Sequence, residues 1–200
     1  LLQVNQISYR LPPQISIASK CTHVINYPQQ ASYNGGQTMI FDCQTGSQFV
    51  DPAASYLRLI VKPVANNTHG FGSGSVANIF SRVVVRTATG KELSRVEDAR
   101  LIMKMLDVYN NANDWRSTTG VSQGYSPESG AVATYCDPIP TAGRLFIIPV
   151  QTLMPCMSPH GAKLVPPNIM SGLRIELSLS QANDAFCSVN QGSVASLASY

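Results

Sequence analysis

Cysteine and histidine are the residues of this 200-residue chain that could ligate a metal or act as nucleophile and base. The five cysteines are widely spaced along the chain: Cys21, Cys43, Cys136, Cys156 and Cys187. The three histidines are also far apart: His23, His69 and His160. Metal ligands usually come as a close pair with partners, so the spacing predicts no metal site. Wide spacing and an odd count favour free thiols in a reducing compartment over a disulfide framework.

Catalytic patterns are weak. The segment Gly70–Ser75 is rich in glycine but lacks the lysine of a phosphate-binding loop. No two carboxylates are marked as a glycosidase pair. A cysteine nucleophile with a distant base, such as Cys136 with His160, is the arrangement that the sequence leaves open. We expect a protein that is not an enzyme, with no catalytic residue and no cofactor.

Trp115 and Arg116 are residue types that protein interfaces favour. Trp115 is the only tryptophan and follows a predicted helix in a polar segment, where it is either a core residue or an exposed anchor. The predicted contacts between subunits are the following aromatic and arginine residues: Tyr9, Tyr27, Tyr33, Trp115, Arg116 and Tyr125.

Charged residues make up 12% of the chain, about half of the ~25% that a soluble domain usually carries. A surface of uncharged polar residues can be buried against neighbours at low desolvation cost, although the same composition also fits an ordinary domain of low charge. The net charge of +3 comes without a Lys/Arg run, so we expect no specific nucleic-acid binding. No apolar run is long enough for a membrane helix, and no signal peptide is visible.

Short alternating segments between turn signals predict an antiparallel β sandwich over residues 37–200, preceded by an extended N-terminal arm over residues 1–36. The clearest alternation is 173–179, where leucine and isoleucine share one face. Four further strands are predicted over residues 38–43, 55–62, 82–87 and 144–149, and Thr89-Gly90 is expected to turn a hairpin.

One inserted α-helix is predicted at about residues 94–110. Ser94 and Glu97 have the spacing of a capping box, in which the hydroxyl and the carboxylate satisfy the first free amides. The helix has an apolar stripe, formed by Ala99, Ile102, Met103, Leu106 and Tyr109. We expect this helix to cross one edge of the sheet.

An ordered series of motifs resembles the first jelly roll of double jelly-roll major capsid proteins of double-stranded DNA viruses. The series is SYLRLIVKP, then GSVANIFSRVVVRTATGKELSRVEDARLIMKML, then RLFIIPV, then KLVPPNIMSGLRIELSLSQANDAF. It covers residues 37–187, and the order of the motifs is more specific than any one of them. The resemblance implies an all-β, antiparallel jelly-roll sandwich that assembles into an icosahedral shell and is located in the virion.

The resemblance also implies the partners. They are other capsid subunits, in trimers or pentamers, together with minor capsid proteins and an internal membrane. A second sandwich is missing, so the chain is expected to be a fragment of a double jelly roll or a single jelly-roll relative, and the start at Leu1 without Met suits a fragment. The arm would reach a neighbour or the membrane-facing side.

Two other functions stay open at this point. A carbohydrate- or receptor-binding β sandwich would use Trp115 and the polar loop at 111–143. A cupin-like enzyme would need a clustered set of histidine and glutamate ligands, which the sequence does not supply.

Overall fold

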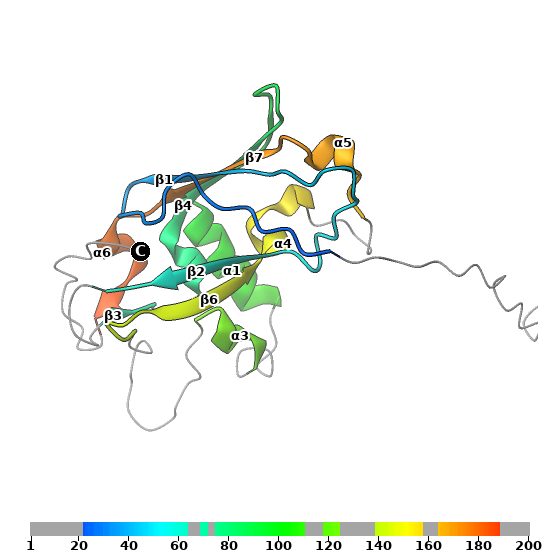
Figure 1. The fold of residues 1–200 in the computed structure, drawn as a ribbon. Helices are drawn as coiled ribbons and strands as arrows, with labels where there is room; N and C mark the ends of the chain where they lie inside the picture. The colour runs from blue at the N-terminus through cyan, green and yellow to red at the C-terminus, as the bar shows by residue number, and fades with distance from the viewer. Residues whose placement is uncertain are drawn as a thin grey trace, which may run out of the picture.

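The computed structural model contains three antiparallel sheets, and the largest of them packs against one of the two smaller ones (Figure 1). The structure describes residues 22–63, 69–71, 75–110, 118–124, 139–157 and 164–188. Within these ranges the larger sheet has the strand order β1 (Thr38–Asp42), β7 (Arg174–Leu179), β4 (Phe80–Arg86) and β5 (Glu92–Glu97). The remaining strands form two pairs: β2 (Tyr56–Val61) with β6 (Arg144–Pro149), and β3 (His69–Gly70) with β8 (Cys187–Ser188). The predicted antiparallel β sandwich is confirmed.

Strand β7 lies between β1 and β4 because its alternation gives it one fully apolar face. Leu177 is opposite Met39 on one side and opposite Val83 on the other. Ile175, Leu177 and Leu179 are buried, whereas Arg174 on the other face is exposed. Side chains on one face of neighbouring strands pack in rows, so this register places the apolar residues toward the core.

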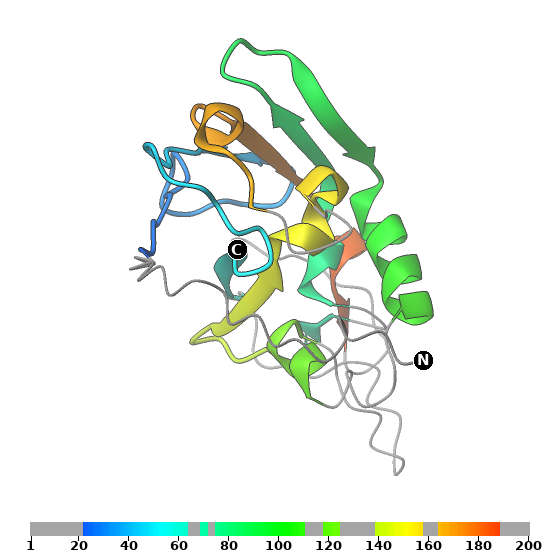
Figure 2. The same cartoon turned by 90° about the vertical axis from the view of Figure 1, so that its right-hand side faces the viewer.

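Strands β4 and β5 form the predicted hairpin. Gly90, with a φ of 83°, adopts the left-handed conformation that the turn requires and that glycine adopts at little cost. The Thr87 amide donates to the Lys91 carbonyl over 2.8 Å, and the Gly90 amide donates to the Thr87 carbonyl over 2.9 Å. The hairpin projects from the body of the molecule (Figure 2).

Strands β2 and β6 also bury one face each. Leu59 is opposite Phe146, and the neighbouring Val61 and Ile148 are fully buried. Alternate residues on both strands therefore point toward the larger sheet, as the period of two predicts.

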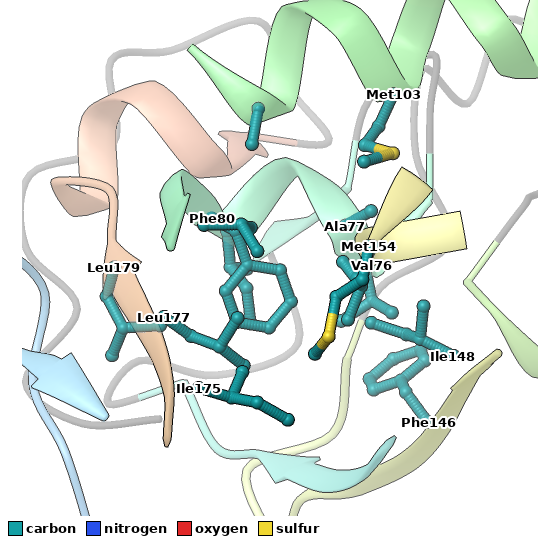
Figure 3. Packing of buried hydrophobic residues seen from close by; sticks show 14 of the residues in the cluster. Val76, Ala77, Phe80, Met103, Phe146, Ile148, Met154, Ile175, Leu177 and Leu179 are labelled. Atoms are coloured by element: carbon teal, nitrogen blue, oxygen red, sulfur yellow. The ribbon is translucent and has the colours of Figure 1, made fainter. Parts of the chain in front are cut away.

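The core fills the space between the two sheets (Figure 3). Phe80 and Leu177 come from the larger sheet, Phe146 and Ile148 come from β6, and all four are no more than 1% exposed. Met103 adds a fully buried side chain from α1. Burial of this apolar surface is the main favourable contribution to folding.

The helices are short, with one exception. They are η2 (Val76–Ile79), α1 (Ala99–Asn110), α3 (Thr119–Ser122), α4 (Val150–Leu153), η3 (Pro155–Met157), α5 (Pro167–Met170) and α6 (Ala182–Ala185). Helix α1 contacts η2 and β4 and covers one side of the sandwich, opposite the side on which β6 lies (Figure 2).

The predicted capping box is wrong. Ser94 and Glu97 lie inside β5, where Glu97 is opposite Arg82, and helix α1 begins only at Ala99. The carbonyl of Asp98 accepts the first helical bonds, from the amides of Leu101 and Ile102. Pairing with β4 extends the strand through the residues that local capping would have used. Asp98, with a φ of 48°, makes the corner between strand and helix.

The described end of the predicted arm, residues 22–36, runs along β1. Pro28 forms an antiparallel bridge with Phe41, and the Gln29 amide donates to the Ile40 carbonyl over 3.2 Å. Tyr33 is only 6% exposed and belongs to the core. This segment therefore covers the β1 edge of the larger sheet, and the arm before residue 22 lies outside the described residues.

Candidate interaction surfaces

The outer side of the β2–β6 pair is largely apolar. We call it the β2–β6 face and define it by the outward side chains Tyr56, Arg58, Ile60, Leu145 and Ile147. Ile60 is opposite Leu145 and Arg58 is opposite Ile147 in the antiparallel register. The four apolar side chains are between 36% and 58% exposed.

This face costs free energy in water. Leu57 and Phe146 point inward on the same strands, so apolar residues occupy both sides of the pair. Exposed apolar surface costs about 25 cal/mol per Å² relative to burial, and neighbouring exposed residues form a patch that a partner can cover. Arg58 supplies the positive charge of the face.

Helix α1 carries a second exposed apolar surface. We call it the α1 face and define it by Leu101, Ile102, Met105, Leu106 and Tyr109, which are between 40% and 81% exposed. The sandwich buries only Ala99 and Met103 of the predicted stripe, because these two residues lie one turn apart on the side that contacts η2 and β4. The other three residues of the stripe, Ile102, Leu106 and Tyr109, stay exposed.

The outer side of the larger sheet is different, because charged side chains pair across its strands. We call these pairs the ion-pair ladder. Arg174 Nε lies 2.8 Å from Asp42 Oδ1, between β7 and β1. Arg86 on β4 lies 3.2 Å from Glu176 Oε1 and 3.6 Å from Glu92 Oε2, so it joins three strands.

The ladder continues on β5, and it covers an apolar residue. Arg95 lies 2.5 Å from Glu97 and 3.7 Å from Glu92. Val84 has the same outward parity as Arg86 but is only 1% exposed. The aliphatic parts of long arginine and glutamate side chains can cover apolar surface while their charged ends reach water. Val84 lies opposite Arg95 and Glu176, so the side chains of the ion-pair ladder cover it.

Two neighbouring ionisable groups at the end of β1, Asp42 and the following Cys43, have pKa values that are shifted in opposite directions. The hydrogen bond and charge of Arg174 lower the pKa of Asp42 below its ordinary value of 3.8. Burial, with a smaller contribution from the Asp42 charge, raises the pKa of the Cys43 thiol to about 11. Cys43 is therefore a protonated and unreactive core residue at neutral pH. Cys43 and Cys156 are free thiols in the part of the chain that the structure describes.

The structure separates the predicted contact residues. Tyr27 is 77% exposed, whereas Tyr33 is buried and its hydroxyl accepts a hydrogen bond from the Gln30 amide over 2.9 Å. The other four predicted contacts lie outside the described residues: Tyr9, Trp115, Arg116 and Tyr125. The same holds for Cys136 and His160 and for most of the polar loop at 111–143, so the nucleophile and carbohydrate hypotheses stay predictions.

Sequence reasoning missed the two exposed apolar faces. A signal was present on β2, where Tyr56 and Ile60 share a face although Leu57, Leu59 and Val61 already supply an inner apolar face. Apolar residues on both faces of a strand indicate either burial on both sides or a surface that a partner covers.

Within the described ranges, every helix is too short or too polar to span a bilayer. The same part of the chain contains no group of three or more His, Cys, Asp or Glu side chains that could hold a metal ion. No protein-family model matches the chain, and no curated protein matches its sequence significantly.

Proposed function

We propose that this protein is a structural subunit of a viral capsid, a jelly-roll sandwich that assembles with other subunits into an icosahedral shell. One observation carries the proposal. The β2–β6 face and the α1 face are both exposed and apolar, and they lie on different sides of one sandwich (Figure 2).

Two separate apolar faces allow one copy to contact two neighbours at once. A protein with one such face stops at a dimer, whereas contacts between different surfaces generate rings or extended assemblies. Burial of both faces also recovers the free energy that their exposure costs in the isolated chain. Both properties suit a shell subunit.

The jelly-roll connection of the strands is part of the proposal. The antiparallel sandwich supports it, together with the order of the sequence motifs that contain β2, β4, β6 and β7. In this arrangement the sheets form rigid walls, and the outward side chains of strands and helices make the contacts between subunits.

The experiment is particle sizing of the purified chain by sedimentation velocity and electron microscopy. We expect closed particles, or trimers or pentamers of fixed size. Ile60→Glu on the β2–β6 face and Met105→Glu on the α1 face should each stop growth, because a carboxylate would be buried at a contact.

Ile169→Glu is the matched control, because Ile169 is 53% exposed on α5 and lies outside both faces. It should leave the particle size unchanged. A monomer at every concentration, or assemblies that ignore both face variants, would contradict the proposed function.

A further inference from the structure

Strand β5 is an edge of the larger sheet, where η3 also contacts it. In the order β1-β7-β4-β5, the opposite edge at β1 is covered by Pro28 and Gln29. Among the described residues, β5 has a strand partner only in β4. The free backbone groups of an edge strand form a template for another strand.

The side chains of β5 limit which strand can pair there. Arg95 and Glu97 point to the outer face, with 45% and 58% of their side-chain surface exposed, and Val96 between them packs against the core. Directly opposite residues on antiparallel strands lie on the same face, so like charges in opposition repel and unlike charges attract. The two charges reject most strands and accept one with the complementary order.

We propose that β5 pairs antiparallel with β5 of a second copy, about a twofold axis at Val96. In this register Arg95 of each copy lies opposite Glu97 of the other, which makes two equivalent ion pairs. Val96 meets its own counterpart on the apolar inner face. The larger sheets of the two copies then form one continuous sheet.

Other registers are less favourable. An axis at Arg95 would place this arginine opposite itself, and an axis at Glu97 would place two carboxylates together. An axis at Ser94 would place Val96 opposite Glu92 and Arg95 opposite Leu93, which mixes apolar and charged residues. Only the axis at Val96 matches both faces.

The same register covers further apolar surface. It brings Leu93 of one copy, 49% exposed, to the start of α1 of the other, where Leu101 is 55% exposed. Strand β5 leads directly into α1 along one side of the molecule (Figure 2), so the contact continues from strand to helix. This contact closes after two copies and does not rest on the proposed shell function.

Charge exchange tests the pairing. Arg95→Glu gives a chain with two acidic side chains at these positions, and Glu97→Arg gives a chain with two basic ones. Each variant alone should dimerise about tenfold or more weakly than the unmodified chain, because its like charges oppose each other. An equimolar mixture of the two should dimerise again, since acidic positions of one then oppose basic positions of the other.

The measurement is sedimentation velocity over a concentration series, in the Ile60→Glu background if the unmodified chain forms larger assemblies. Circular dichroism checks that both variants fold. Lys91→Glu is the control, because Lys91 opposes Glu97 only with the axis at Ser94, so its dimer should be unchanged. A monomeric unmodified chain, unaffected single variants, or a mixture without recovery would each overturn the proposal.

Discussion

The outer faces of the two sheets meet water in opposite ways. On the larger sheet, the ion-pair ladder joins four strands, and even an outward valine, Val84, is covered by neighbouring side chains. On the β2–β6 pair, Ile60 and Leu145 stand opposite each other and remain exposed. The first face pairs its charges and covers its apolar residue within one chain, whereas the second leaves apolar side chains exposed to water.

Two outer surfaces of one sandwich can therefore favour different behaviour, one remaining in water and the other associating. Charged pairs across strands stabilise a face only modestly, but they keep it soluble and unfit for nonspecific contacts. An exposed apolar face lowers the solubility of the single chain and gives free energy to association.

The largest losses of stability should be about equal for the two sheets, because the inner faces of both are buried in the same core. Leu177→Ala on β7 and Phe146→Ala on β6 should each lower the free energy of unfolding by about 2–5 kcal/mol, from lost burial and a cavity. Urea denaturation measures this loss. A much smaller loss for Phe146→Ala would show that the β2–β6 pair is not part of the common core.

Gly124 sharpens the contrast on the β6 side. Its φ is +89°, and an added Cβ would lie 3.0 Å from ring atoms of both Phe146 and Phe71. Gly124→Ala should therefore cost about 2 kcal/mol, from backbone strain and ring displacement. Gly90→Ala is the control, since its φ is similarly positive but nothing lies within 4 Å of an added Cβ. Equal losses in thermal unfolding would show that the ring contacts contribute nothing.

Outer-face substitutions should have opposite consequences on the two sheets. Glu176→Ala removes a partner of Arg86 and should lower the free energy of unfolding by about 0.5–1 kcal/mol, with association unchanged. Leu145→Ser should alter stability by no more than about 1 kcal/mol but should weaken association. Urea denaturation measures the stability of both variants, and sedimentation velocity measures their association. A Glu176→Ala chain that associates more weakly would contradict the expected difference between the two outer faces.

The smallest effect should be a pH dependence of the ladder. Arg174 lowers the pKa of Asp42 in the folded chain, so this pair stabilises the protein above the ordinary pKa of 3.8. This stabilisation is lost as the pH falls from 3.8 through the lower pKa that Asp42 has in the folded chain. Asp42→Asn should therefore unfold at a slightly lower temperature at pH 7 but not at pH 2. An equal difference at both pH values would contradict the assignment.

Much of the fold could be predicted from local patterns. The alternation at 173–179, the β-branched run of β4 and the glycine turn all specify structure through neighbouring residues, and all three are confirmed. The start of α1 could not be predicted in this way. Ser94 and Glu97 fit a helix cap locally, but pairing with the distant register of β4 places them in a strand.

The candidate surfaces were harder to predict for the same reason. An apolar pattern shows that Ile102 and Ile60 prefer burial, but not whether this chain buries them. Exposure depends on where α1 and β6 pack, which is a property of the whole sandwich. The predicted contacts show the converse, because Tyr33 is an interface residue type that the chain itself buries.

The central position of β7 has a consequence for synthesis on the ribosome. The Thr38 hydroxyl on β1 forms a hydrogen bond with the Ser178 hydroxyl on β7, across 140 residues of sequence. Strand β4 also pairs with β7 and cannot do so before β7 has been synthesised. The larger sheet therefore cannot close until almost the whole described chain has left the exit tunnel. Contacts this distant in sequence form slowly, and nascent chains that expose unpaired strands are prone to aggregate. Chains truncated before residue 174 should depend on chaperones and be degraded rather than fold.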